Sequence, residues 1–349
     1  MIKVLIVDDS AVEMEFLDFM LSSHSDIKVI GKAKDGEEAI QSLAHTKPDV
    51  ITMDIHMPKM DGYETTKIIM ETNPVPIVIV SASSGKEVDK TYKAIQAGAL
   101  AFVEKPVGFD HPDFDKVKNN LIETVKLMSE VKVVKRRFKP EVETKPSASS
   151  ANNFKGLMQK DYSIIVIGVS TGGPAVLQEL LSKLPKNFSI PIIIVQHIAS
   201  GFLPGLIDWL SDCTLLNYKV PAQNEVIQQG YVYFAPDDYN IGITNNNSIV
   251  LSNDEMENGL RPSVSYLFRS TANTIGEKAI GIIMTGMGKD GAAELKLMRD
   301  KGALTIAQDK ESSIVFGMPK ESIKLDAAQY ILPPERIASL LIRLDRNKI

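Results

Sequence analysis

The stretch GIIMTGMGKDGAAELKLMRDKG, residues 281–302, runs from an apolar segment through a glycine-rich loop into a helical pattern. Because a buried strand followed by such a loop and a helix is the repeating unit of α/β folds, the stretch predicts a parallel sheet covered by helices. From Gly286 onward it also matches the dinucleotide-binding pattern G-x-G-x-x-G, with Asp309 at about the distance expected of a ribose ligand. Two hypotheses follow: a nicotinamide site, or a loop in which Asp290 carries the chemistry.

Two blocks of the chain repeat this alternation of apolar runs and amphipathic segments. Residues 1–128 and residues 161–349 both predict doubly wound parallel-sheet domains of the α/β class, the first flavodoxin-like and the second Rossmann-like. Between them, residues 129–160 are rich in Lys, Pro, Ser and Asn and predict a flexible linker. In the second block, YVYFAP, NIGIT and SIVLSN lie close together around a turn at 245–247 and predict an antiparallel hairpin or meander.

Composition narrows the class of protein. A chain of 349 residues with 44% hydrophobic and 24% charged residues is ordinary for a soluble protein of two domains. The net charge of -5 and the lack of a concentrated basic stripe argue against nucleic-acid binding. No apolar run reaches the ~18 residues of a membrane span, which argues against membrane insertion. The start of the chain does not read as a signal peptide, and Cys213 is the single cysteine, so we expect a cytoplasmic protein without an internal disulfide.

Polar side chains close the strand-like runs of the first block. Asp8 and Asp9 end the first run, Asp54 the third and Ser81 the fourth, while Lys105 follows the fifth. Because ligands of open α/β sheets sit beyond the carboxyl ends of the strands, we expect these side chains to converge on one rim.

The chemistry that suits this rim is phosphoryl transfer. Clustered carboxylates repel one another unless a hard cation such as Mg²⁺ joins them. Asp54 would be the nucleophile that forms an aspartyl phosphate, and Lys105 and Ser81 would contact the phosphoryl oxygens. As the alternative, Asp8 and Asp9 only cap the next helix and Lys105 forms an ordinary salt bridge.

The same residues resemble the response-regulator receiver family over residues 1–128. The matching pieces are the Asp8–Asp9 pair, DIHMPKMDG around Asp54, Ser81-Ala82 and FVEKP around Lys105. The resemblance implies that Asp54 accepts phosphate from a chemotaxis histidine kinase. It also implies Mg²⁺ held by Asp8, Asp9 and Asp54, together with the backbone carbonyl of His56, and it puts Phe102 at the position of the family's aromatic switch residue.

The second block begins with SIIVIGVSTGGPAVLQEL, residues 163–180, in which Ser170 stands at a strand-to-helix turn. Glycines flank this serine in the pattern G-x-S-x-G of a nucleophile elbow, because the turn is tight and a substrate must approach its backbone. A helix expected to begin near Pro174 aims its N-terminal amides at the turn and favours negative charge there. Alternatively, Ser170 or Thr171 merely caps that helix.

A serine nucleophile needs a base, and His197 is the only histidine of the second block. It ends the strand-like run IPIIIVQH. Asp290, at another strand end, is the candidate carboxylate that orients the imidazole. The alternatives that the pattern favours less are Asp309 after a different strand, and Asp237 and Asp238 after YVYFAP. A Cys213–His197 dyad is a further rival, but the context of Cys213 favours a buried structural thiol.

Five ordered motifs resemble the catalytic domain of CheB, the chemotaxis protein-glutamate methylesterase family, over roughly residues 161–345. They are IGVSTGGP, VQHI, RPSVSYLFRS, TGMGKDGAAEL and VFGMPK. The resemblance places the family's catalytic triad on Ser170, His197 and Asp290. It implies hydrolysis of glutamyl methyl esters, and deamidation of certain glutamines, on methyl-accepting chemoreceptors, with no cofactor for the ester chemistry. It also implies that the receiver covers the active site until Asp54 is phosphorylated.

In the expected mechanism Ser170 attacks the ester carbonyl while His197 takes its proton. Backbone amides near Thr171 and in the turn at 286–288, which includes Met287, are the candidates for stabilising the oxyanion. IASGFLPG after the histidine and the segment APDDYN depart from the family's pattern, which puts the substrate-groove contacts in question. Two other functions compete: a receiver-linked dehydrogenase that uses the late glycine loop, and a catalytically silent receiver and adaptor.

Overall fold

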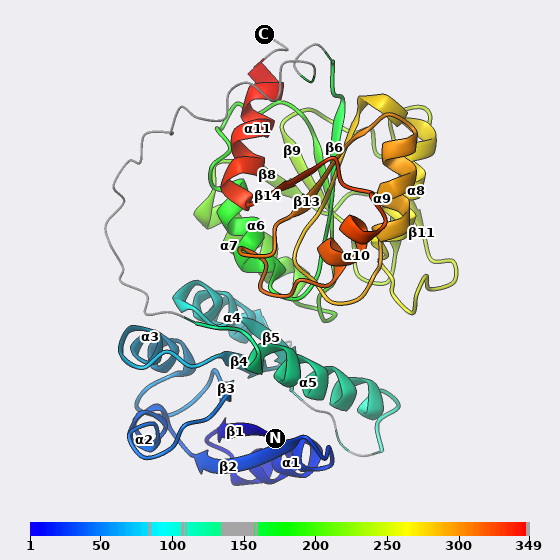
Figure 1. Cartoon of the computed structure of the whole chain (residues 1–349). Coiled ribbons are helices and arrows are strands. Elements are labelled where there is room, and N and C mark those ends of the chain that lie inside the picture. The colour runs from blue at the N-terminus through cyan, green and yellow to red at the C-terminus, as the bar shows by residue number, and fades with distance from the viewer. Residues whose placement is uncertain (83–84, 106–107, 109, 134–156, 158–159, 347–349) are drawn as a thin grey trace. The chain divides into compact units, whose positions relative to one another are not determined.

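The computed structural model describes the chain except for residues 83–84, 106–107, 109, 134–156, 158–159 and 347–349. The chain divides into two compact units, Met1–Val142 and Glu143–Ile349 (Figure 1). Most of the predicted linker, 129–160, lies outside the described residues, so its flexibility and its exact boundaries stay predictions.

The first unit is a five-stranded parallel sheet in the order β2-β1-β3-β4-β5. Its strands are β1 (Ile2–Val7), β2 (Ile27–Ala33), β3 (Val50–Asp54), β4 (Ile77–Ser81) and β5 (Ala101–Glu104). Its helices are α1 (Ala11–Ser22), α2 (Gly36–Ser42), α3 (Gly62–Thr72), α4 (Gly85–Ala97) and α5 (Phe114–Ser129). This is the flavodoxin-like strand order, whose direction reverses between β1 and β3, and it confirms the predicted fold class.

The second unit is a seven-stranded sheet in the order β14-β13-β12-β6-β7-β9-β8, with all of its pairs parallel. Its strands are β6 (Ile164–Val169), β7 (Ile192–Gln196), β8 (Asn217–Lys219), β9 (Tyr231–Phe234), β12 (Ala279–Ile283), β13 (Leu304–Gln308) and β14 (Tyr330–Leu332). Its helices are α6 (Gly173–Leu181), α7 (Leu203–Cys213), α8 (Val264–Thr274), the 3₁₀ turn η3 (Gly276–Lys278), α9 (Ala292–Asp300), α10 (Met318–Lys324) and α11 (Pro334–Arg346).

The predicted hairpin is confirmed for two of its three runs. β10 (Asn240–Ile243) and β11 (Ile249–Ser252) pair in antiparallel register, and the turn between them places Asn247 at φ 56. The run YVYFAP is different, because it forms β9 and pairs in parallel with β7. Closeness along the chain suggested a meander, but a run buried at three of its four positions belongs inside a parallel sheet.

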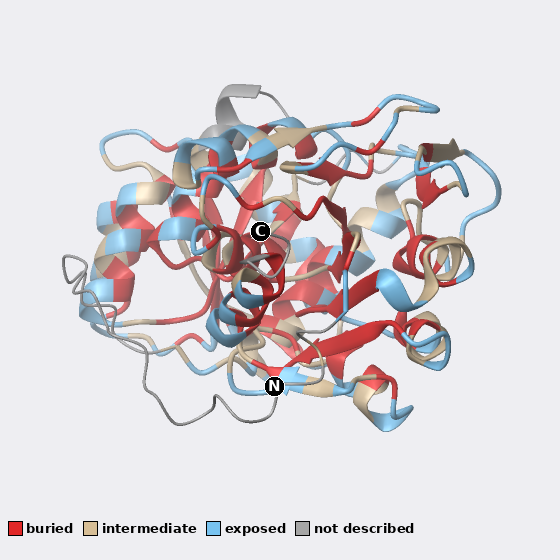
Figure 2. Cartoon of the chain, turned by 90° about the horizontal axis from the view of Figure 1, so that it is seen from above, coloured by how far each residue is buried: buried red, intermediate tan, exposed pale blue. Residues whose placement is uncertain are grey.

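The order of strands creates a crevice in the second sheet. The first strand of this sheet along the chain is β6. The next strands add on one side of it, beginning with β7, and β12 then pairs with its other side. The carboxyl ends of β6 and β12 therefore flank a switch point, where ligands of such sheets bind. Figure 2 shows that buried residues concentrate on the strands and on the inner sides of the helices. Among the described helices, none has both the length and the apolar character that crossing a bilayer would require.

Candidate active site

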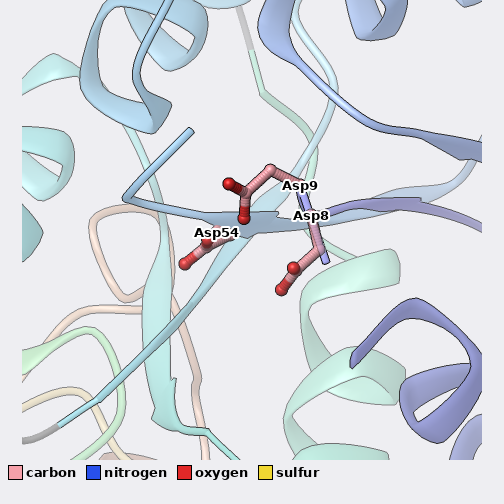
Figure 3. A group of neighbouring side chains, drawn as sticks. All are labelled: Asp8, Asp9 and Asp54. Atoms are coloured by element: carbon pink, nitrogen blue, oxygen red, sulfur yellow. The ribbon is translucent and has the colours of Figure 1, made fainter. Parts of the chain in front are cut away.

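Three carboxylates meet at the carboxyl ends of β1 and β3 in the first unit. Asp54 is the last residue of β3, and Asp8 and Asp9 follow β1 directly, so the sheet itself brings them together (Figure 3). One oxygen from each lies within 4.8 Å of the others, and Asp8 and Asp54 are buried. Carboxylate oxygens are hard ligands, and several of them lie close together here. Because Mg²⁺ binds to such oxygen ligands, the residues predicted to hold the metal fit that ion.

Lys105 faces this cluster, as predicted. Its Nζ atom lies 3.2 Å from Oδ2 of Asp8 and 3.1 Å from Oδ1 of Asp54. Burial raises the pKa of Asp54 to about 6; the positive charge of Lys105 opposes the rise and the negative charge of Asp8 adds to it. A buried carboxyl group with so high a pKa is incompletely neutralised by one lysine, which favours a further cation at this rim.

Neither Asp8 nor Asp9 is the N-cap of the helix that follows β1. Ser10 is the N-cap of α1 and accepts a hydrogen bond from the Glu13 amide, while Asp8 accepts one from the Ser10 amide. Ser81 ends β4 with its side chain buried, and its carbonyl accepts from the Lys105 amide at 2.8 Å. Phe102 is half-buried and meets the buried ring of Tyr92 edge-on, with ring centroids 5.7 Å apart.

Ser170 follows β6 in a turn that the neighbouring strand holds. Its amide donates to the carbonyl of Thr285 at 2.9 Å, and its own carbonyl accepts from the Gly173 amide at 2.8 Å. The N-cap of α6 is Gly172, at φ 78, and it has no side-chain capping bond, so neither Ser170 nor Thr171 caps the helix. A Cβ atom on Gly286 would lie 2.6 Å from Cβ of Ser170, so the glycine loop after β12 packs directly on the serine.

His197 and Asp290 form an ion pair beside that turn. Nε2 of His197 lies 3.1 Å from Oδ2 of Asp290, although the ring N–H is not aligned well enough for a hydrogen bond. His197 follows β7, and its amide donates to the carbonyl of Val169, the residue before Ser170. The strand pairing of β6 with β7 thus sets the backbones of the serine and the histidine next to each other.

Asp290 sits at the N-terminus of α8. Its oxygens accept from the amides of Val264 and Ser265, at 2.7 and 3.2 Å, and from the hydroxyl of Ser263 at 2.9 Å. Burial alone would raise the pKa of Asp290, but the interaction with His197 and the hydrogen bonds from the start of α8 lower it to about 2. A helix N-terminus stabilises the anion in addition, so the carboxylate stays ionised while buried.

The chain resembles known proteins over nearly its full length. A family model described as CheB methylesterase matches residues 165–341, and one described as response regulator receiver domain matches residues 4–112. A protein-glutamate methylesterase/protein-glutamine glutaminase 1 of Syntrophus aciditrophicus is 50% identical over 346 residues, which are 99% of this chain and 98% of the relative. The chain belongs to the CheB methylesterase family.

Further comparisons agree with this membership of the CheB family. A protein-glutamate methylesterase/protein-glutamine glutaminase of Nitrosospira multiformis is 50% identical over 345 residues, which cover 99% of this chain and 97% of that protein. The crystal structure of the Thermotoga maritima CheB methylesterase catalytic domain superposes with a TM-score of 0.51 at 38% identity, covering 53% of this chain and all of that one.

Two buried polar residues at the site of this CheB chain were missed by the sequence reasoning. Gln196, in the VQHI motif, donates from its amide to the carbonyls of both Ser170 and His197. Thr285, in the TGMG motif, donates from its hydroxyl to the carbonyl of Thr171 at 3.0 Å. Neither residue type is a nucleophile, a base or a metal ligand, so only their burial at strand ends next to the serine and the histidine identifies them.

The rival residues lie in other arrangements. Cys213 is the last residue of α7, burial raises the pKa of its thiol, and no described contact joins it to His197. Asp309 accepts from the amide of Ser312 in its own loop. Asp237 accepts from the amide of Gly201 at 2.8 Å and from the hydroxyl of Ser200. The two segments that depart from the CheB family pattern are therefore bonded to each other.

Two of the three glycines in the G-x-G-x-x-G match pack against neighbouring elements of the same unit. A Cβ atom on Gly286 would collide with Ser170, and one on Gly291 would lie 2.3 Å from Cγ1 of Val264 at the start of α8. Gly291 has φ 81 and is the N-cap of α9. The loop thus packs against the serine turn and α8, which accounts for Gly286 and Gly291 without a pyrophosphate, while Gly288 adopts a positive φ of 85.

The lowered pKa of Asp290 predicts a pH dependence of stability. Because its folded pKa of about 2 lies below the ordinary value of 3.8, its contribution is complete above the ordinary value and is lost as pH falls through the folded one. We expect the ionised Asp290 carboxylate to contribute roughly 2 kcal/mol to the free energy of unfolding at neutral pH, and about half of this contribution to be lost by pH 3. Urea unfolding of wild type and Asp290→Asn between pH 3 and 6 measures this difference, which should shrink only below about pH 4. A difference that is constant down to pH 3 would contradict the lowered pKa.

Proposed function

We propose that this protein is a phosphorylation-activated protein-glutamate methylesterase that also deamidates glutamine side chains, acting on methyl-accepting chemoreceptors in the cytoplasm. The observation that carries the proposal is the ion pair of His197 with Asp290, at 3.1 Å, beside the Ser170 turn at the switch point of the second sheet. The printed names of the CheB relatives, which state both activities, support it.

The chemistry follows from a serine, a base and a buried anion. Oγ of Ser170 attacks the glutamyl ester carbonyl while the ring nitrogen of His197 that does not face Asp290 takes the hydroxyl proton. Asp290, held ionised by α8, stabilises the imidazolium that forms. The protonated ring then gives its proton to the methoxide oxygen of the breaking ester bond, which leaves as methanol, or to the amide nitrogen of a glutamine, which leaves as ammonia. Water hydrolyses the acyl-enzyme by the same route.

Two peptide groups are suited to stabilising the tetrahedral oxyanion. The carbonyl of Ser170 is held by Gly173 and Gln196, and the carbonyl of Gly286 accepts from Gly317 and Met318. Because a trans peptide is planar, the amides of Thr171 and Met287 must point to the opposite sides. Neither amide donates a hydrogen bond within the described part of the chain, so both are free to meet a developing negative charge.

The receiver unit would bind Mg²⁺ through Asp8, Asp9 and Asp54, and the backbone carbonyl of His56 is the proposed further ligand. When bound, the ion neutralises the charge of an incoming phosphoryl group and of the acidic cluster. The residues of the chain supply the rest: Asp54 is the proposed phosphate acceptor, for which a chemotaxis histidine kinase is the proposed donor. Lys105, already within 3.1 Å of Oδ1 of Asp54, would contact the phosphoryl oxygens, as would Ser81.

Methanol release tests the proposed activity. Wild-type protein should release methanol from membranes that carry a methylated chemoreceptor and none from membranes whose receptor was never methylated. A receiver-linked dehydrogenase instead predicts binding of a nicotinamide cofactor, and a silent adaptor predicts no methanol and no labelling of Ser170 by a fluorophosphonate. The proposal fails if methylated receptor yields no methanol above the unmethylated control.

Phosphorylation of Asp54 should raise the rate. We expect acetyl phosphate with Mg²⁺ to increase methanol release by about 10-fold or more, the size of a typical allosteric coupling. The increase should vanish in Asp54→Asn and after removal of Mg²⁺ with EDTA, whereas the basal rate persists in both. Asp49→Asn is a matched control, because Asp49 lies just before β3 and accepts from the Lys3 amide away from the cluster. Equal rates with and without the phosphodonor would contradict gating.

A further inference from the structure

Gln196 is a buried amide that contacts both reacting residues of the proposed site. It is the last residue of β7, with 5% of its surface exposed. Its Nε2 atom donates to the carbonyl of Ser170 at 3.0 Å and to the carbonyl of His197 at 2.8 Å. One side-chain group thus joins the backbone of the serine to the backbone of the histidine.

The orientation of this amide is dictated by its neighbours. Two carbonyl oxygens can be satisfied only by a donor, so the NH₂ group must face them and Oε1 must face away. Oε1 is buried and accepts no hydrogen bond from the described residues. An apolar side chain of equal length would avoid this unsatisfied oxygen, but it would also remove the two hydrogen bonds that the amide donates to the carbonyls of Ser170 and His197.

The packing around the amide is also specific. A Cβ atom on Gly173 would lie 2.0 Å from Oε1 of Gln196 and 2.7 Å from Cγ2 of Val169. Only a glycine at the start of α6 therefore leaves space for the amide of Gln196. The same Gly173 donates from its own amide to the carbonyl of Ser170, which consequently receives two donors.

We propose that Gln196 is a positioning residue that sets the relative geometry of the nucleophile, the base and one oxyanion donor by holding the carbonyls of Ser170 and His197. Fixing the Ser170 carbonyl fixes the plane of the peptide that carries the Thr171 amide. Fixing the His197 carbonyl, together with the bond from the His197 amide to Val169, holds the histidine backbone on both sides. This inference rests on the proposed function, because it presumes that Ser170 and His197 react.

Gln196→Met tests the inference, because it keeps the length of the side chain and removes both donors. We expect kcat for methanol release to fall about 10- to 100-fold, with KM changed by less than about threefold, since misplaced groups slow the chemical step rather than substrate binding. Labelling of Ser170 by a fluorophosphonate should slow in parallel.

Thr305→Val is the matched control. Thr305 is buried in β13 of the same sheet, and its hydroxyl also makes two hydrogen bonds, to the carbonyl of Ala327 and from the amide of Gln329. It should lose stability but keep its kcat. The inference is overturned if Gln196→Met retains wild-type kcat, or if Thr305→Val loses as much kcat at an equal loss of melting temperature.

Gln196→Glu gives a second test that does not depend on the folding of the methionine variant. An ionised carboxylate cannot donate to the two carbonyls, whereas a protonated one can donate to one of them. The ratio of its kcat to that of wild type should therefore rise as pH falls from 9 to 6, and a flat ratio would overturn the inference. Ser170→Ala in the same assay separates the two levels: if it keeps wild-type activity, the proposed function fails, whatever Gln196 does.

Discussion

Replacing Ser170 with alanine should lower kcat for methanol release by roughly 10⁴- to 10⁶-fold, as loss of the nucleophile does in serine triads generally. The size follows from the geometry of the turn. Ser170 is fixed by bonds to Thr285, Gly173 and Gln196, and Gly286 lies against its Cβ atom. The hydroxyl of Ser263 also lies beside the His197–Asp290 pair, but it is fully buried and donates to Asp290, so we expect no substitute nucleophile from it.

The measurement is single-turnover methanol release from methylated receptor membranes. Ser163→Ala is the matched control, because Ser163 lies just before β6, at the opposite end of the same strand, and its hydroxyl contacts only the carbonyl of Lys278 at 3.5 Å. We expect that variant to keep wild-type activity. A Ser170→Ala/His197→Ala double variant should be no slower than either single one, since the residues act as a unit. Wild-type rates in Ser170→Ala would exclude the serine mechanism.

The fold could be predicted because the sequence pattern is local. Apolar runs that end in polar residues mark parallel strands, and their carboxyl ends define a rim, so the pattern alone places Asp8, Asp54 and Lys105 together. The run that forms β9 was wrongly predicted as part of a meander, because its pairing is not local in the sequence. Its parallel pairing with β7 joins residues far apart in the chain, and nothing in YVYFAP distinguishes a parallel strand from one arm of a meander.

The sequence proposed the chemically able groups of the candidate site, whose roles stay a prediction, but not the polar residues that support them. A serine, a histidine or an aspartate can be proposed as a reactive group from its residue type alone. The amide of Gln196 and the hydroxyl of Thr285 matter only through the backbone carbonyls to which they donate, and the sequence does not show those contacts. The capping alternatives for Ser170 and Asp8 could be excluded only from the structure, because helices start one or two residues away from where sequence patterns place them.

The two units place buried carboxylates in opposite electrostatic environments. Asp54 lies next to Asp8, and burial raises its pKa to about 6, so its anion is poorly stabilised until a cation or a covalent bond relieves it. Asp290 is as deeply buried, yet its pKa is lowered to about 2 by His197 and by the donors at the start of α8. The proposed phosphate acceptor and the proposed orienting carboxylate are thus distinguished by the charges and donors around them rather than by their exposure.

Asp290→Asn should consequently lower kcat by about 10⁴-fold, as expected when a triad loses the carboxylate that fixes the tautomer of its histidine. Both oxygens of Asp290 already face donors: Oδ1 faces Ser263 and Ser265, and Oδ2 faces Val264 and His197. An asparagine NH₂ group must therefore oppose one of them. If it turns toward the ring, it forces the facing nitrogen to accept, and the proton moves to the nitrogen that should take the proton of Ser170.

Asp309→Asn provides the matched comparison, because Asp309 also follows a strand of the same sheet and was the rival assignment. Its carboxylate binds only Ser312 within its own loop, so we expect kcat close to wild type. Rates should be measured below the melting temperature of Asp290→Asn, which also loses hydrogen bonds to α8. If Asp309→Asn is the inactive variant and Asp290→Asn is active, the third member of the triad has been assigned to the wrong strand, because each carboxylate is bonded within a different loop and neither can substitute for the other.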